Sequence, residues 1–318
     1  MRRFLLNALA FALLQLAVLA GLWSLWADWE GGGNEYWAAT VDKHARLAAT
    51  PAPRLVLVGD SNLAFGIRSE RLEQALGRPV VNMAMAGNWQ PEWALREVED
   101  ALRPGDWVVL SFAPDWWDMT SPPHMPKVYT LARVRPAALL DYDDWETVQV
   151  LLDEGLRISG PIGAALFRRL AGVTGDTRYR TPPYTRDSFN GYGDVTGHHV
   201  APRRQPPRDV PVMDFETYQG FFDGLDAWAR AREAEGVRVV YTPPPVAESH
   251  YERNRDLLGR LDALLRRETS IPLTHRQSEM LYPEADIFDS AYHLTEEASA
   301  RRTDELAEAL RRLLVEDG

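Results

Sequence analysis

The sequence of 318 residues contains no cysteine. This absence excludes disulfide bonds, thiolate metal ligands, a cysteine nucleophile and lipid attachment through cysteine. An excess of positive charge is lacking as well, because 35 Lys and Arg residues stand against 46 Asp and Glu residues, a net charge of −11. Nucleic-acid-binding proteins normally carry a basic surface, so we expect no nucleic-acid partner. The sequence also lacks a phosphate-binding glycine loop, a dinucleotide fingerprint and metal-ligand spacing, and we expect no cofactor and no metal.

One long stretch without any charged residue occupies positions 4–26 and follows Arg2 and Arg3. About 20 apolar residues are enough for a helix to cross a bilayer, and positively charged flanks stay on the cytoplasmic side. The pattern predicts a cytoplasmic tip at residues 1–3, a transmembrane signal anchor at residues 4–26, and an exported remainder that faces the periplasm or the cell exterior. A cleaved signal peptide that ends near Ala20 is the alternative, and it also exports the remainder.

Beyond this stretch, short apolar runs alternate with amphipathic segments, which predicts an α/β domain at residues 52–318. We expect a three-layer, flavodoxin-like sandwich with a mostly parallel sheet. Residues 27–51 are interpreted as a juxtamembrane linker. Residues 119–213, rich in proline and aromatic residues and with helical pieces at 145–156 and 162–170, are interpreted as an insertion over one end of the sheet. The predicted strands are 54–58, 79–83, 107–112 and 237–241, and the predicted helices are 68–77, 91–102, 215–235, 251–268 and 295–315.

Ser61 lies on a turn directly after the first predicted strand. Ligands of open α/β sheets bind at the carboxyl ends of the strands, so this serine is a candidate nucleophile. A nucleophilic serine needs a base and usually a carboxylate that orients the base. His293 precedes the last predicted helix and has Asp286 and Asp289 nearby. The competing interpretations are a helix cap for Ser61 and an ordinary surface residue for His293.

Taken together, these motifs resemble the SGNH, or GDSL, hydrolase superfamily, most of all its membrane-anchored bacterial members. The sequence Gly59-Asp60-Ser61-Asn62 is similar to the first block of the family, and Asn82-Met83-Ala84-Met85-Ala86-Gly87-Asn88 to the second. The resemblance covers roughly residues 52–118 and 214–315. It implies that Ser61 is the nucleophile, that His293 is the base, and that the N–H groups of Ser61 and Gly87 bind the oxyanion.

The carboxylate departs from the family pattern. The family usually places its acid three residues before the histidine, where this sequence has Ser290, whereas Asp289 is four residues before His293. We predict that Asp289 orients the imidazole, because four residues in a turn bring a carboxylate back to the ring and the seven residues from Asp286 require a longer excursion. A backbone carbonyl is the main competitor for this role.

The third block of the family departs too, because Pro114 stands where the family has an asparagine that donates to the oxyanion. Proline has no N–H group and no side-chain donor. We therefore consider Asn62, Asn88 and Asn190 as replacement donors. For Asn190, which is followed by Gly191, an ordinary turn is the competing interpretation.

The resemblance implies a membrane-anchored esterase or acyltransferase that acts on O-acyl groups, chiefly O-acetyl groups, of an envelope glycan or lipid. Ser61 would attack the acyl carbonyl, His293 would carry the proton and Asp289 would hold His293. The expected partners are an acylated polysaccharide or lipid substrate and the membrane at residues 4–26. The alternative is a non-catalytic accessory protein that keeps the fold and contacts envelope-assembly or exopolysaccharide-assembly proteins, and a plain tethered binding domain is a third interpretation.

Overall fold

The structure is a computed structural model that describes residues 2–30, 34–118, 182–203 and 215–316. Its main sheet has four parallel strands in the order β2-β1-β3-β4. The strands are β1 (Leu55–Gly59), β2 (Val80–Asn82), β3 (Trp107–Ser111) and β4 (Arg238–Tyr241). Strands β1 and β3 are buried along their whole length, as expected for a parallel sheet covered on both faces. The predicted parallel strands are confirmed, and β1 lies between β2 and β3 as expected.

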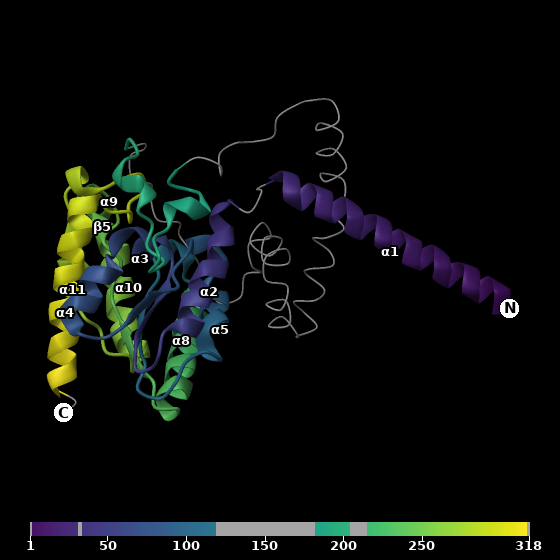
Figure 1. Ribbon diagram of the computed structural model, residues 1–318. Helices are drawn as coiled ribbons and strands as arrows, with labels where there is room; N and C mark the ends of the chain where they lie inside the picture. The colour runs from purple at the N-terminus through teal and green to yellow at the C-terminus, as the bar shows by residue number, and fades with distance from the viewer. Residues whose placement is uncertain (1, 31–33, 119–181, 204–214, 317–318) are drawn as a thin grey trace.

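Helices cover both faces of this sheet, with α4 and α11 on one side and α5 and α8 on the other, while α2 contacts β2 (Figure 1). A separate two-stranded parallel sheet joins β5 (Val246–Ala247) to β6 (Leu281–Tyr282). The helices are α1 (Arg2–Glu30), α2 (Thr40–Ala49), α3 (Ser61–Gly66), α4 (Ser69–Leu76), α5 (Pro91–Glu99), α8 (Phe215–Ala234), α9 (Glu248–Arg253), α10 (Arg255–Glu268) and α11 (Glu296–Glu316).

One predicted helix is two helices in the structure. The stretch predicted as a helix at 251–268 is divided between α9 and α10 at Asn254, whose backbone leaves the helical region. The side chain of Asn254 donates to the carbonyl of His250 at 2.9 Å. Asparagine side chains compete for backbone groups in this way, which accounts for the break.

The prediction that residues 27–51 form a linker is wrong for residues 34–49. These residues form a 3₁₀ turn, η1 (Tyr36–Ala39), and α2, and the side chains of Tyr36 and Trp37 are buried. Lys43 on α2 is buried as well and donates to the carbonyls of Asn82, Ala84 and Gly193. The segment therefore packs against the end of β2, because its aromatic side chains bury apolar surface and its lysine finds three acceptors.

Two further sequence predictions concern the N-terminal helix and the inserted segment. Among the described residues, no helix combines the length and the apolar character that crossing a membrane requires. Of the predicted insertion, residues 182–203 are described, and the helical pieces predicted at 145–156 and 162–170 lie outside the described residues.

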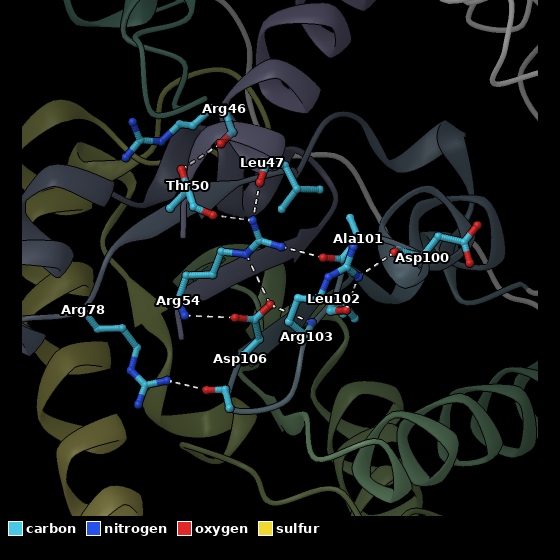
Figure 2. A network of polar contacts seen from close by, with 11 residues as sticks. Arg46, Leu47, Thr50, Arg54, Arg78, Asp100, Ala101, Leu102, Arg103 and Asp106 are labelled. Atoms are coloured by element: carbon cyan, nitrogen blue, oxygen red, sulfur yellow. Dashed lines mark hydrogen bonds and ion pairs between the residues drawn. The ribbon is translucent and has the colours of Figure 1, made fainter. Parts of the chain in front are cut away.

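A buried ion pair between Arg54 and Asp106 joins the starts of β1 and β3 (Figure 2). Ser61 follows the other end of β1. Arg54 and Asp106 are connected twice, because the backbone N–H and the Nε atom of Arg54 donate to the two carboxylate oxygens of Asp106 at 3.0 and 3.2 Å. The guanidinium also donates to the carbonyls of Thr50 and Ala101. Removing one partner of such a buried pair costs about 3–5 kcal/mol. This network holds β1 and β3 in the register that brings Gly59 opposite Ser111.

Candidate active site

Ser61 lies at the first position of α3, immediately after β1, on a turn that its neighbours fix. An added Cβ atom at Gly59 would lie 2.0 Å from the carbonyl oxygen of Ser111, so only glycine lets β1 approach β3 this closely. Asp60 caps α3, because its carboxylate accepts from the backbone N–H of Asn62 at 2.8 Å. The other oxygen of Asp60 accepts from the backbone N–H of Ala113, which ties the turn to the end of β3.

A hydrogen-bonded chain of three side chains starts at Ser61. Its Oγ atom lies 2.7 Å from Nε2 of His293, and Nδ1 of His293 lies 2.7 Å from Oδ1 of Asp289. Ser61 and His293 are 232 residues apart in the sequence. Both distances fall within the range in which a base takes a proton from a nucleophile and a carboxylate fixes the tautomer of the base. The structure thus brings together the three residues that the sequence singled out.

The loop before α11 explains how an acid four residues before the histidine reaches it. Ile287 and Leu294 form an antiparallel bridge, and the N–H of Phe288 donates to the carbonyl of His293 at 2.8 Å. This turn places Asp289 next to the imidazole of His293. The other acid considered from the sequence, Asp286, pairs instead with an arginine on α11, Arg301.

Aromatic packing holds the imidazole of His293 in place. The ring of Phe65, four residues after Ser61 on α3, stacks on it at a centroid distance of 4.1 Å and an angle of 3°. A second histidine, His198, packs against the same Phe65 ring at 5.0 Å. Burial, together with the neighbouring His199 and His293, lowers the pKa of His198 to about 3, so this histidine stays neutral at physiological pH.

The charge state of Asp289 follows from its partners. Burial raises the pKa of this carboxyl, but the hydrogen bond and charge of His293 and a hydrogen bond from the hydroxyl of Tyr184 more than offset burial, so the pKa lies below its usual value. Asp289 is therefore an anion at neutral pH. An anionic acceptor at Nδ1 stabilises the positive charge that the imidazole gains when it takes a proton.

The two backbone N–H groups expected to bind an oxyanion are those of Ser61 and Gly87, and within the described residues neither donates a hydrogen bond. Gly87 begins a 3₁₀ turn, η2 (Gly87–Trp89), which follows β2. The segment between β2 and η2 runs along the end of β1, because the N–H of Met85 donates to the carbonyl of Gly59 at 3.2 Å. The indole of Trp116 lies directly against Gly87, where an added Cβ atom would be 2.0 Å from Nε1.

The predicted replacement donors do not fill the position of the missing asparagine. The prediction for Asn62 is wrong, because its side chain is buried and its amide donates to Asp60 and to the carbonyl of Ser111. The prediction for Asn190 is also wrong, because its amide donates to the carboxylate of Asp194 and its oxygen accepts from the N–H groups of Tyr192 and Asp194, which closes a turn. The side chain of Asn88 lies outside the described residues.

Sequence reasoning missed two residues that support the turn around Ser61 and its neighbourhood. Arg302 on α11 is fully buried and donates to the backbone carbonyl and the side-chain oxygen of Asn62 at 2.6 and 2.9 Å. A signal was present, because Arg302 lies at four-residue spacing in a stripe of buried apolar residues, with Ala298 before it and Leu306 after it. Asp115 is the second residue missed: burial raises its pKa to about 6, and Tyr292 is a hydrogen-bond partner.

Comparisons with known proteins add no assignment. No model of a known protein family matches the chain, and no curated protein matches it. Within the part of the chain that the structure describes, no group of histidine and acidic side chains is arranged to hold a metal ion.

Proposed function

We propose that this chain is a serine esterase or O-acyltransferase of the SGNH type. The observation that carries the proposal is the hydrogen-bonded chain from Ser61 through His293 to Asp289, with 2.7 Å at each step. A serine within hydrogen-bond reach of a base that a carboxylate orients is the arrangement of a nucleophile activated for acyl transfer. The strand order and the location of Ser61 at the carboxyl end of β1 support a flavodoxin-like, SGNH-hydrolase-like arrangement of the domain.

In the proposed reaction, Oγ of Ser61 attacks the acyl carbonyl while Nε2 of His293 takes the hydroxyl proton. The tetrahedral intermediate collapses when His293 gives this proton to the departing alcohol, which leaves an acyl group on Ser61. Water or an acceptor alcohol then attacks the acyl-enzyme by the same steps, with His293 as the base, and Ser61 regains its proton. Asp289 keeps Nδ1 of His293 protonated throughout, so that Nε2 always faces the reacting oxygen.

The N–H groups of Ser61 and Gly87 supply the proposed oxyanion site. A donor aimed at the developing negative charge contributes about 3 kcal/mol to the transition state, so two donors account for a large share of the rate. Pro114 replaces the family's third donor and has no N–H group. We therefore expect a slower esterase than a family member with all three donors, by about 100-fold.

The substrate class that we propose is an O-acyl ester, chiefly an O-acetyl ester, of an envelope glycan or lipid, as the resemblance to the membrane-anchored SGNH hydrolases implies. Location of the domain outside the cytoplasm stays a prediction from Arg2, Arg3 and the uncharged residues that follow. A reporter that is active only outside the cytoplasm, fused after Gly318, tests this location independently. An inactive reporter on a stable fusion protein would contradict it.

A second candidate function is a non-catalytic accessory role in envelope or exopolysaccharide assembly. The observation that favours it is Pro114, which removes a donor from the proposed oxyanion site. The two candidates differ in the reactivity of Ser61. An accessory protein has no need for a serine hydroxyl that a base activates, whereas an esterase requires it.

Covalent labelling with a fluorophosphonate probe tests the proposal. We expect the wild-type protein to be labelled and to release acetate from acetylated glycans, and Ser61→Ala to do neither. Ser270→Ala is the matched control, because Ser270 bonds to Asp226 and lies outside the proposed site. If Ser61→Ala and wild type are labelled equally, or if neither is labelled while both are folded, the accessory role replaces the enzyme.

A further inference from the structure

Both carboxylate oxygens of Asp289 are occupied in the structure. Oδ1 accepts from His293, and Oδ2 accepts from the phenolic hydroxyl of Tyr184. Tyr184 is 105 residues away from Asp289 in the sequence and belongs to residues 182–203, outside the two stretches that resemble the hydrolase family. The acid of the proposed triad therefore has a second partner that comes from the inserted part of the chain.

The ring of Tyr184 is held by the rings that surround the base. Its centroid lies 5.9 Å from that of Phe65 and 6.0 Å from that of Tyr36. Phe65 is also the ring that stacks on His293. One aromatic side chain on α3 therefore contacts both the base and the tyrosine that bonds to the acid, so the position of the hydroxyl is coupled to that of the imidazole.

The backbone around Tyr184 is fixed by the segment that follows α1. Thr185 forms an antiparallel bridge with Glu35, and the N–H of Arg186 donates to the carbonyl of Asn34 at 3.0 Å. The guanidinium of Arg186 makes a bidentate ion pair with Asp42 at 2.7 Å. These contacts hold residues 184–186 through residues 34–42, and none of them involves the loop that carries Asp289.

From these contacts we propose that Tyr184 is a positioning residue for the catalytic acid: its hydroxyl fixes the rotation of the Asp289 carboxylate so that Oδ1 stays directed at Nδ1 of His293. The proposal rests on the proposed function. A carboxylate held through a single oxygen can turn about its Cβ–Cγ bond, and the acid here lies on a turn one residue longer than the family's. Donors on both oxygens remove this freedom, and a pre-organised acid keeps the imidazole in the productive tautomer.

The charged and titratable groups around the carboxylate agree with this role. His293 faces one oxygen and Tyr184 the other, and in the part of the chain that the structure describes, His198 and Tyr36 also interact with this carboxylate. Burial raises the pKa of Asp289, and the bonds from His293 and Tyr184 act in the opposite direction. Loss of the Tyr184 hydroxyl thus raises the pKa of the acid, which loosens its hold on the imidazole in mildly acidic solution.

The test compares Tyr184→Phe with Tyr192→Phe in the full-length protein. Each substitution removes a tyrosine hydroxyl that bonds to a carboxylate, but Tyr192 bonds to Glu73 at 3.3 Å, away from the proposed triad. We expect Tyr184→Phe to lower kcat on an acetyl ester by about 10- to 100-fold with KM unchanged, since a hydrogen bond to a charged group is lost and no substrate contact is touched. The acidic limb of the kcat/KM profile should move to higher pH, and Tyr192→Phe should match wild type.

A second readout does not need activity. The low-field proton resonance of Nδ1–H in His293 reports on the bond to Asp289, and we expect it to shift or broaden in Tyr184→Phe and to stay unchanged in Tyr192→Phe. If the resonance of Tyr184→Phe matches wild type, or if both variants change alike, the positioning role is overturned even for an active esterase. If wild type lacks esterase activity but the resonance responds as expected, the structural inference holds and the proposed function fails.

Discussion

Gly87→Ala would add one methyl group at the proposed oxyanion site. The φ angle of Gly87 lies outside the left-handed region, so alanine suits its backbone. The obstacle is the indole of Trp116, whose Nε1, Cδ1 and Cε2 atoms would lie 2.0, 2.1 and 2.5 Å from the new Cβ atom. Non-bonded heavy atoms are comfortable at about 3.5–4.0 Å, so either the indole or the backbone of residue 87 must move by about 1.5 Å.

This displacement sets the size of the expected effect. A shift of about 1 Å in a catalytic group costs on the order of 100-fold in rate, and removing one oxyanion donor costs about 100- to 1000-fold. Alanine keeps the N–H group of Gly87, so any loss comes from its displacement rather than its removal. We therefore expect Gly87→Ala to lower kcat on an acetyl ester by about 100-fold.

A double-mutant cycle with Trp116→Ala isolates the cause. Trp116 is only partly buried, so its truncation leaves room for the methyl group without opening a deep cavity. We expect Gly87→Ala to cost less than about threefold in the Trp116→Ala background, because the clash is gone and the donor returns to its place. Steady-state kinetics of the four proteins gives the coupling. Equal losses in both backgrounds would refute the role of the indole. Full activity of Gly87→Ala would show that the indole moves aside while the N–H group of residue 87 stays in place, which would refute the expected displacement of the donor.

Three further outcomes follow from the contacts around the site. Asp289→Asn should lower turnover about 10⁴-fold by favouring the wrong tautomer of His293, with an unchanged urea midpoint, and near-normal turnover would place the orienting group elsewhere. Burial raises the pKa of Asp115 to about 6, so the folded state holds this proton more tightly than the unfolded chain. Wild-type stability should fall as pH rises from about 4 to about 6, by about 2 kcal/mol. Urea unfolding of Asp115→Asn should lack this part of the fall, and identical pH dependence in both proteins would contradict it. Arg302→Met removes two hydrogen bonds to Asn62 and should lower the free energy of unfolding by about 3 kcal/mol, whereas a loss below about 1 kcal/mol in urea unfolding would show that these bonds contribute little.

The main sheet could be predicted from the sequence because its strands are short apolar runs, of which β1 ends at Gly59 and β3 at Ser111. The contact between Ser61 and His293 could be anticipated for a different reason. A serine after the first strand and a histidine before the last helix both lie at the carboxyl edge of a parallel sheet, and the family resemblance supplied the pairing. Local pattern and topology were sufficient for these features.

The remaining features depend on contacts between segments far apart in the chain. Within residues 34–49, one of the buried positions of α2 is a lysine, and the burial of Lys43 depends on three carbonyls from other segments that accept its hydrogen bonds. Tyr184 reaches Asp289 across 105 residues from a segment that pattern alone marks as an insertion. The sequence leaves Asn62 as a candidate oxyanion donor next to Ser61, because its burial under Arg302 depends on how α11 docks. Such contacts depend on the assembled fold and cannot be read from a short stretch of the sequence.

The docking of α11 has a consequence for the life of the chain before it is complete. Ser61 and its turn are synthesised early, but the base lies just before α11, and the arginine that clamps the turn is on α11 itself. Until the ribosome has released that helix, Ser61 of a nascent chain has no His293 as a base, and its turn lacks the hydrogen bonds from Arg302. The proposed reactivity toward esters is therefore acquired only after α11 has been synthesised, and we expect a chain interrupted before α11 to lack it.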